Sequence, residues 1–459
     1  MSFGWFLKRP CSGAGYFIDR DFTLSPTEQG VYDALESDFR ELSRTREFPS
    51  RQDAAACMAA LLKRHCEKLH LLLPRSRGQV ITAAAELNLL GLGPLDLILA
   101  DESIEEVAVV GAGRPVFAYV RGRGWLSTNC FITSEEFAAE LANRMAKPLG
   151  RRLTLHSPRL NAPLATGDRL HASMPPVSVN GVELTIRKFR SQPFSLAELA
   201  GAGALPFPAA AALSLAAFAD VNIAVVGNTG SGKTTLLNSL FSFIPLSERV
   251  VVTEETPELR LPQEHAVRMV SNRELGVSLQ DLVEDTLRMR PDRVVVGEVR
   301  SAGEARALFD ALLAGQARGT LFTMHGRSAG EALSRLSSLG ASSDELAAID
   351  LVVAVRRAQV LSPSGPVESR RLTELMVNRP GRPKLFGPTS PGLSAAVFDL
   401  VEKNYGLGRG EFKRELSLRE AFMRNNATLP FGEFTALFQQ NFLAGDTAQQ
   451  PFLDGDAHD

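Results

Sequence analysis

The sequence lacks any hydrophobic stretch long enough to cross a lipid bilayer. Its longest apolar run, Ala209 to Ala219, has 11 residues, whereas a membrane-spanning helix needs about 20. The N-terminal residues MSFGWFLKRP contain no apolar segment of the kind that signal peptides carry. We therefore expect a cytoplasmic protein whose association with the cell membrane is peripheral, at the cytoplasmic face.

Cysteine is scarce and scattered. The four cysteines are Cys11, Cys57, Cys66 and Cys130, and no CxxC motif with partner histidines is present for zinc. We expect buried free thiols in a reducing cytosol and no zinc site.

A net charge of either sign is also lacking. Lys+Arg number 50 and Asp+Glu 52, for a net charge of −2 at pH 7, so the overall charge does not argue for nucleic acid or an anionic membrane as partner. Only 2 Trp and 4 Tyr are available to stack on bases, so no nucleic-acid partner is expected. Lysine is rare within the basic set, and Lys233 is the only lysine between Arg190 and Pro383.

Hydrophobic periodicity predicts four parts. Residues 1–85 read as an N-terminal helical bundle, with a capping-box spacing at Ser25 and Glu28. Residues 86–192 read as an α+β module of short strands and one helix. Residues 193–360 alternate apolar strands with helices, which predicts an α/β domain with a parallel sheet covered on both faces. Residues 361–459 read as a mostly helical extension.

The segment GNTGSGKT, Gly227 to Thr234, matches the phosphate-binding loop pattern G-x-x-x-x-G-K-[ST] in full. It follows the apolar strand NIAVVG and opens the helix KTTLLNSLF, which is the required context. Backbone N–H groups of such a loop surround a polyphosphate, Lys233 reaches the β- and γ-phosphates, and the Thr234 hydroxyl binds Mg²⁺. The residues expected to bind ATP are Gly227, Asn228, Thr229, Gly230, Ser231, Gly232, Lys233, Thr234 and Thr235.

Three further segments end in polar groups. VVVTEETPEL carries Glu254, Glu255 and Glu258 after a strand, and by itself a solvated turn explains it best. RPDRVVVGEVR is a second strand that ends in Glu298, an acid expected at the tip of the strand beside the P-loop strand. GTLFTMHGRS is a third, with His325 at its end. Because parallel strands end at one sheet edge, these groups should meet the P-loop, and His325 is expected to sense the γ-phosphate or position water.

This order of segments is similar to that of the secretion-superfamily ATPases, which power type II and type IV secretion, type IV pili and archaella. Walker A (227–234), the acidic box (254–259), the Walker B-like VVVGEVR and the histidine box all occur in sequence. The similarity covers about 86–357. The stretch SLGASSDELAAIDLVVAV and the long C-terminal extension look like the archaeal branch.

The resemblance implies a RecA-like P-loop ATPase domain, a PAS-like α+β module before it and a homohexameric ring. Glu255 stands at the catalytic acidic position, with Glu254 a supporting neighbour and Glu258 an anchor of the following loop. Glu255 and Glu298 would position Mg²⁺, through water, and the attacking water.

ATP would lie between the α+β module and the P-loop domain, where arginines close on the γ-phosphate. The matching positions are Arg169 and Arg187, with Arg190, Arg268 and Arg273 as further candidates. An integral membrane platform protein of a pilus or secretion machine would be the partner of the N-terminal bundle.

This sequence also departs from the family pattern. Glu255 replaces the usual Asp, Ser301 the usual Gly and Gly326 the usual Ala. These changes remove no required chemical group, and they leave open a nucleotide-binding scaffold with little hydrolysis. A DNA-translocating RecA-like motor is the other alternative, because such rings also move nucleic acid.

Overall fold

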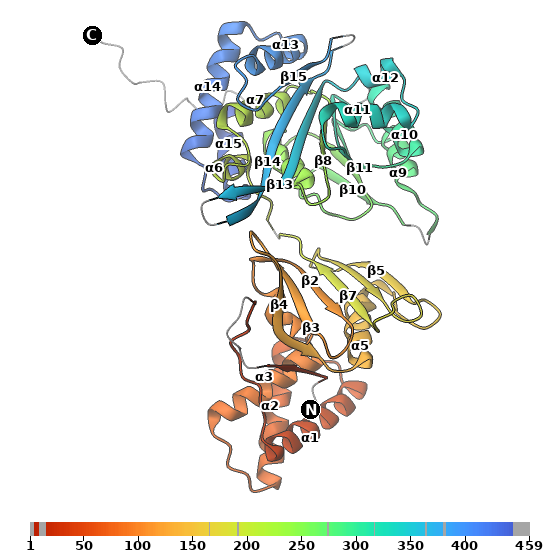
Figure 1. The fold of residues 1–459 in the computed structure, drawn as a ribbon, viewed down its shortest axis with the longest axis vertical. Coiled ribbons are helices and arrows are strands. Elements are labelled where there is room, and N and C mark those ends of the chain that lie inside the picture. The colour runs from red at the N-terminus through yellow and green to blue at the C-terminus, as the bar shows by residue number, and fades with distance from the viewer. Residues whose placement is uncertain are drawn as a thin grey trace, which may run out of the picture. The chain divides into compact units, whose positions relative to one another are not determined.

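The computed structural model describes residues 4–8, 15–164, 166–190, 192–272, 275–315, 317–362, 365–379 and 382–443. They form two compact units, 1–190 and 191–459, which are described separately below and are both drawn in Figure 1. None of the helices in these ranges combines the length and the apolarity that a bilayer crossing requires.

The first unit combines helices with one antiparallel sheet of seven strands, in the order β1-β4-β3-β2-β7-β6-β5. Its helices are α1 (Pro26–Thr45), α2 (Arg51–Lys68), α3 (Arg75–Leu89), α4 (Leu95–Leu99) and α5 (Glu135–Ala146), which the 3-10 turn η1 (Lys147–Leu149) follows. Its strands are β1 (Trp5–Leu7), β2 (Ile104–Val110), β3 (Pro115–Val120), β4 (Gly124–Ile132), β5 (Arg159–Pro163), β6 (Arg169–Ser173) and β7 (Glu183–Arg187). The strands and the one helix predicted over 86–190 are confirmed, whereas β1, β5 and the short helix α4 were not predicted.

One hydrophobic core joins the helices of this unit to its sheet. Buried Val31 and Leu35 of α1 belong to the same cluster as Val107 and Leu184 of the sheet. Strand β1 adds to the connection, because its fully buried Trp5 donates its indole N–H to the Asn88 side chain of α3. The helices expected over 1–85 therefore share their core with the module expected over 86–192.

The second unit is built on a mixed sheet of eight strands, in the order β10-β9-β11-β12-β8-β13-β14-β15. The pairs from β10 to β13 are parallel, and β13-β14-β15 are antiparallel. The strands are β8 (Ile223–Gly227), β9 (Val250–Glu254), β10 (Ala266–Val270), β11 (Arg293–Val299), β12 (Gly319–His325), β13 (Leu351–Ser362), β14 (Gly365–Val377) and β15 (Lys384–Phe386). The boundary expected near 360 falls inside the β13–β14 hairpin, so residues 365–377 continue this sheet.

Helices cover both faces of this sheet (Figure 1). Along β8, Ile223 and Val225 face one core, whereas Ala224 and Val226 face the other. Strands that are buried on both faces give continuous apolar runs, which is the pattern expected from the sequence. The helices on the first face are α6 (Leu196–Gly201), α7 (Phe207–Phe218), α8 (Lys233–Leu240), α13 (Leu393–Tyr405), α14 (Arg409–Asn425) and α15 (Phe431–Phe442), with the 3-10 turn η2 (Phe241–Phe243). Those on the second face are α9 (Leu279–Thr286), α10 (Ala302–Leu313), α11 (Ala329–Ser338) and α12 (Ser343–Ala347).

A buried arginine fastens the C-terminal helices to the rest of the second unit. The Arg419 guanidinium of α14 lies over the rings of Phe218, Phe438 and Phe442, with carbon-to-centroid distances of 5.2–5.3 Å. Burial lowers its pKa to about 10, partly offset by Glu415. Cation–π contacts and Glu415 thus compensate the charge in an apolar setting, and the C-terminal helices are part of this core.

A test of the first unit concerns Glu28, which joins α1 to α3. Its carboxylate accepts Arg77 Nε at 2.6 Å and the Ser25 backbone N–H at 2.8 Å. The hydrogen bond from Arg77 lowers its pKa from 4.5 to about 2, so its contribution is complete above pH 4.5 and is lost as the pH falls towards 2. We expect Glu28→Gln to lower the free energy of unfolding at pH 7 by about 1–2 kcal/mol, with a smaller difference below pH 4.5.

Tryptophan fluorescence during urea unfolding measures this, because both tryptophans, Trp5 and Trp125, lie in the first unit. Glu41→Gln, at an exposed position of the same helix, is the control. Equal stability of the two variants at pH 7 would contradict the assignment.

Candidate nucleotide-binding site

The P-loop connects the central strand β8 to α8. Gly227 admits no side chain, because a Cβ there would collide with Ser231 Oγ and the Val355 carbonyl. Gly230 (φ +72°) and Gly232 (φ +98°) adopt the left-handed conformation that favours glycine. Ser231 is buried, and its hydroxyl has no hydrogen-bond partner among the described residues, which is consistent with a loop shaped for an additional acceptor such as a phosphate.

The side chain of Lys233 is buried, and its amine contacts groups from three strand ends. Nζ lies 3.2 Å from the Gly227 carbonyl oxygen, 3.5 Å from His325 Nδ1 and 3.6 Å from Glu298 Oε1. Glu298 Oε1 in turn lies 2.9 Å from His325 Nε2. The structure thus brings together the lysine, acid and histidine that the sequence predicted at one sheet edge.

The strand order differs from expectation in one respect. The strand beside the P-loop strand is β12, which ends in His325, and β11 with Glu298 lies one strand further away. Glu298 nevertheless reaches Lys233, and the same carboxylate oxygen contacts His325 at the end of β12. Strand β11 has a register irregularity between Val296 and Val299, next to Glu298.

Arg300 was missed by the sequence reasoning. Its Nε donates to Glu298 Oε2 at 2.7 Å, and its Nη1 donates to Glu255 Oε2. The sequence contains a signal for Arg300. In an extended chain side chains alternate with a period of two, so residues 298 and 300 of VVVGEVR lie on the same side. Glu255 and Glu298 are therefore joined through one guanidinium.

The electrostatics of the cluster favour an ionised acid and a neutral histidine. Burial raises the pKa of Glu298, but the hydrogen bond and charge of Arg300, with Lys233 and His325, outweigh burial and lower it. Burial and the charge of Lys233 lower the pKa of His325, against the opposing effect of Glu298. At neutral pH the site therefore presents a carboxylate beside an uncharged imidazole.

Glu254 has a different role from its neighbour. Its carboxylate is buried and accepts the backbone N–H groups of Glu258 at 2.8 Å and Leu259 at 2.9 Å. The Arg268 guanidinium lies 3.4 Å from its other oxygen. Glu254 therefore anchors the loop after β9, a role predicted for Glu258, and Arg268 is its ion-pair partner.

The oxygen donors at this edge fit Mg²⁺. Thr234 and Thr235 are half-buried in the first turn of α8, and Glu255 is half-buried at the end of β9. The described part of the chain contains no group of three or more His, Cys, Asp or Glu residues arranged to hold a metal alone. Protein-bound Mg²⁺ usually has one or two protein ligands and completes its shell with phosphate and water, so these residues suit an ion that arrives with a nucleotide.

The predicted arginines of the first unit lie together. Arg169 and Arg187 are paired directly across β6 and β7, and their guanidinium carbons lie 5.5 and 5.7 Å from the centre of the Phe189 ring. Asp168 accepts the backbone N–H of Phe189 at 2.8 Å and fixes that residue. Arg190 is exposed at the end of the unit, and Arg273 lies outside the described residues.

Comparison with known proteins agrees with this geometry. A family model described as "Type II/IV secretion system protein" matches residues 147–383, a segment that begins before β5 and includes the P-loop, both acidic segments and His325. The chain belongs to this family. The P-loop and both acidic segments within this match belong to the second unit, residues 191–459.

Relatives of this chain occur in archaea and bacteria. An uncharacterized protein of Methanocaldococcus jannaschii is 38% identical over 238 residues, which make up 49% of this chain and 32% of that protein. A putative conjugal transfer protein of Mycobacterium tuberculosis is 37% identical over 267 residues, or 55% of this chain and 74% of that protein. The type IV secretion system protein VirB11 of Bartonella quintana is 30% identical over 248 residues, which make up 46% of this chain and 69% of that protein. The chain thus spans about a third of the archaeal relative, and the matches identify the family but not the branch.

Substitutions of Glu254 and of Glu255 should have different effects, the first on stability and the second on ATP hydrolysis. Glu254→Ala leaves two backbone N–H groups and Arg268 without their acceptor, and we expect the free energy of unfolding to fall by about 2–4 kcal/mol. Glu254→Gln keeps an acceptor oxygen and should lose less. Glu255→Gln should unfold like the wild type and lose ATP hydrolysis. Urea unfolding followed by far-UV circular dichroism measures the stability of each variant, and phosphate release measures its ATP hydrolysis. Hydrolysis by Glu255→Gln at the wild-type rate would refute the assignment of Glu255 as the catalytic acid.

Proposed function

We propose that this protein is a homohexameric, Mg²⁺-dependent ATPase that powers assembly of a type IV pilus-like filament or type II/IV secretion. The observation that carries the proposal is the convergence of Lys233, Glu298, His325 and Arg300 beside the P-loop. A cation for phosphate oxygens and an ionised acid for water are the two groups that hydrolysis of ATP requires at this place.

Each side chain has a task in hydrolysis. Lys233 offsets the charge on the β- and γ-phosphates, and the P-loop N–H groups orient them. Glu298 and Glu255 orient the attacking water, and neutral His325 hydrogen bonds without adding a charge. The Thr234 hydroxyl and, through water, Glu255 and Glu298 would hold Mg²⁺, which supplies charge neutralisation on the phosphates when bound.

Arg169 and Arg187 are the candidates for a further contact with the nucleotide. Two adjacent guanidiniums fixed against Phe189 form a compact positive group, and a guanidinium binds phosphate oxygens in bidentate geometry. We assign them to the γ-phosphate, where negative charge develops during hydrolysis.

The cellular setting is proposed from the processes for which the relatives are named. Conjugal transfer and type IV secretion are the processes named for the mycobacterial and Bartonella proteins. An ATPase of such a machine works in the cytoplasm and reaches the membrane through a partner, here an integral membrane platform protein.

The central test is Glu298→Gln, which removes the carboxylate charge at nearly constant shape. We expect phosphate release to fall by about 10²-fold or more while ATP binding changes little, because Lys233 and the P-loop remain. Glu284→Gln, at an exposed position of α9, is the charge-matched control and should hydrolyse ATP normally.

Two outcomes would favour the alternatives. Wild-type protein that binds ATP without releasing phosphate would be a nucleotide-binding scaffold. Stimulation of phosphate release by single-stranded DNA, with salt-sensitive binding, would indicate a DNA-translocating motor.

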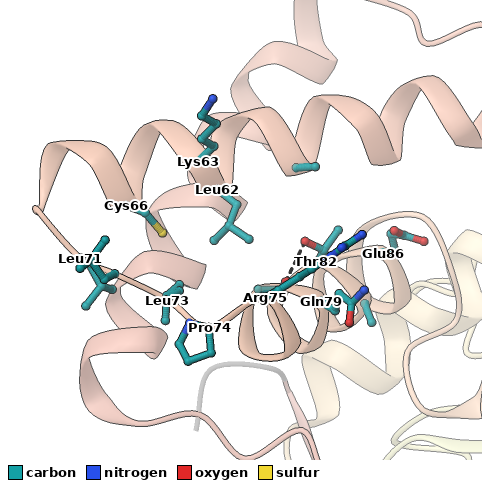
Figure 2. Close-up of a pocket in the computed structure, with 14 residues that line it drawn as sticks. Leu62, Lys63, Cys66, Leu71, Leu73, Pro74, Arg75, Gln79, Thr82 and Glu86 are labelled. Atoms are coloured by element: carbon teal, nitrogen blue, oxygen red, sulfur yellow. Dashed lines mark hydrogen bonds between the residues drawn. The ribbon is translucent and has the colours of Figure 1, made fainter.

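A groove on the first unit is the candidate docking surface for the platform protein. It encloses about 720 Å³ between α2 and α3 and includes Leu62, Cys66 and Leu73 in its lining, with Lys63 and Arg75 also among the lining side chains (Figure 2). Leu72, which also lines it, is 96% exposed. We assign it to an amphipathic helix of the platform protein, with apolar residues towards the leucines and an acidic residue towards Arg75.

Point substitutions test this docking, because deleting α1–α3 would also remove part of the hydrophobic core that these helices share with the sheet. We expect Leu72→Ser to weaken binding to the detergent-solubilised platform protein by about 10-fold or more, as for an anchor residue at an interface. Leu155→Ser, at another exposed leucine of the unit, is the control. Unchanged binding by Leu72→Ser would exclude the groove as the docking surface.

A further inference from the structure

Arg300 connects the ends of two neighbouring strands through their acidic side chains. Its guanidinium contacts Glu298 of β11 through Nε and Nη2 and Glu255, next to the end of β9, through Nη1. The guanidinium is therefore shared between the two acids to which the proposed function assigns water and metal. Its planar fork is suited to holding two carboxylates in one plane.

The backbone of Arg300 is fixed as well. Its N–H donates to Glu304 Oε2 at 2.6 Å, and the adjacent Ser301 caps α10. The arginine is thus held at its main chain by a helix N-terminus and at its tip by two carboxylates. Movement of the guanidinium is restricted at both ends, as a positioning role requires.

The charges around Glu255 and Glu298 depend on Arg300. Lys233 lies 3.6 Å from Glu298, and Arg300 contacts both acids. Without the guanidinium, the two carboxylates would face each other with less compensation and would repel. They would then move apart or attract another cation.

We propose that Arg300 is a positioning residue, which holds Glu255 and Glu298 in register with Lys233 and occupies the space in which these acids would otherwise capture a divalent cation without nucleotide. This inference rests on the proposed function for the roles of the two acids. It makes tight binding of the metal conditional on the nucleotide, whose phosphates bring the ion.

Kinetics of phosphate release and metal binding together test the proposal. For Arg300→Gln we expect kcat about 10²-fold lower with KM for ATP within about threefold of wild type, because substrate binding by the P-loop is intact. Arg300→Lys should recover part of kcat, since an ammonium can neutralise one carboxylate but cannot bridge two. Arg327→Gln is the matched control. Arg327 lies two residues after the end of β12, and its N–H donates to a helix glutamate at 2.9 Å, as that of Arg300 does. The kcat of this variant should equal that of wild type.

Manganese binding without nucleotide is the readout that does not depend on hydrolysis. Followed by electron paramagnetic resonance, Mn²⁺ should bind Arg300→Gln about 10-fold more tightly than wild type or Arg327→Gln. The double variant Glu255→Gln/Arg300→Gln should lose this gain. Failure of wild type to release phosphate would refute the proposed function while leaving the manganese test in force.

Two results would overturn the proposal. One is a kcat for Arg300→Gln within about twofold of wild type, and the other is a manganese affinity that does not change. The proposal would also be overturned if Arg300→Lys and Arg300→Gln lost kcat equally and lost the same thermal stability. That pattern would indicate a role of Arg300 in folding alone.

Discussion

Parallel pairing of β8, β12, β11 and β9 is the constraint on which the site depends. In this register His325 lies opposite Gly227, and Val296 lies opposite Thr253. Parallel strands end at one edge of their sheet, so groups from residues 227, 255, 298 and 325 meet although they are far apart in the sequence. The apolar cores on the two faces of the sheet hold the strands in this register. Packing of the strands therefore determines where the side chains of the site lie.

Charge compensation organises the edge once the strands are aligned. Lys233 and Arg300 provide positive charge for Glu298 and Glu255, and His325 stays neutral because burial and Lys233 lower its pKa. Glu254 is separated from this group, because backbone N–H groups and Arg268 satisfy it. Two adjacent glutamates thus differ in role, since successive residues of a strand end point in opposite directions.

The type of each long element was predictable from the sequence. Apolar runs such as NIAVVG and VVVGEV gave buried parallel strands, and Ser25 with Glu28 gave the capping box at the start of α1. Strand β1 was missed because three residues carry too little periodicity to identify. Strand β5, RLNAP, was missed because it contains few apolar residues and ends in a proline, which is tolerated here at the edge of the sheet. The β14 strand was read as part of a helical extension, because its pairing with β13 is a contact that local pattern does not encode.

The sequence by itself determined the P-loop, its lysine and the acids and histidine that follow neighbouring strands. These features depend on residue type and local spacing. A glycine-rich turn between a strand and a helix, followed by a lysine, is the local pattern of a phosphate-binding loop. Only the tertiary structure decided that β12 separates β11 from β8, that Glu254 anchors a loop and that Arg300 joins Glu255 to Glu298. Strand order and side-chain partners arise from contacts between segments that are distant in the chain, and local sequence does not specify them.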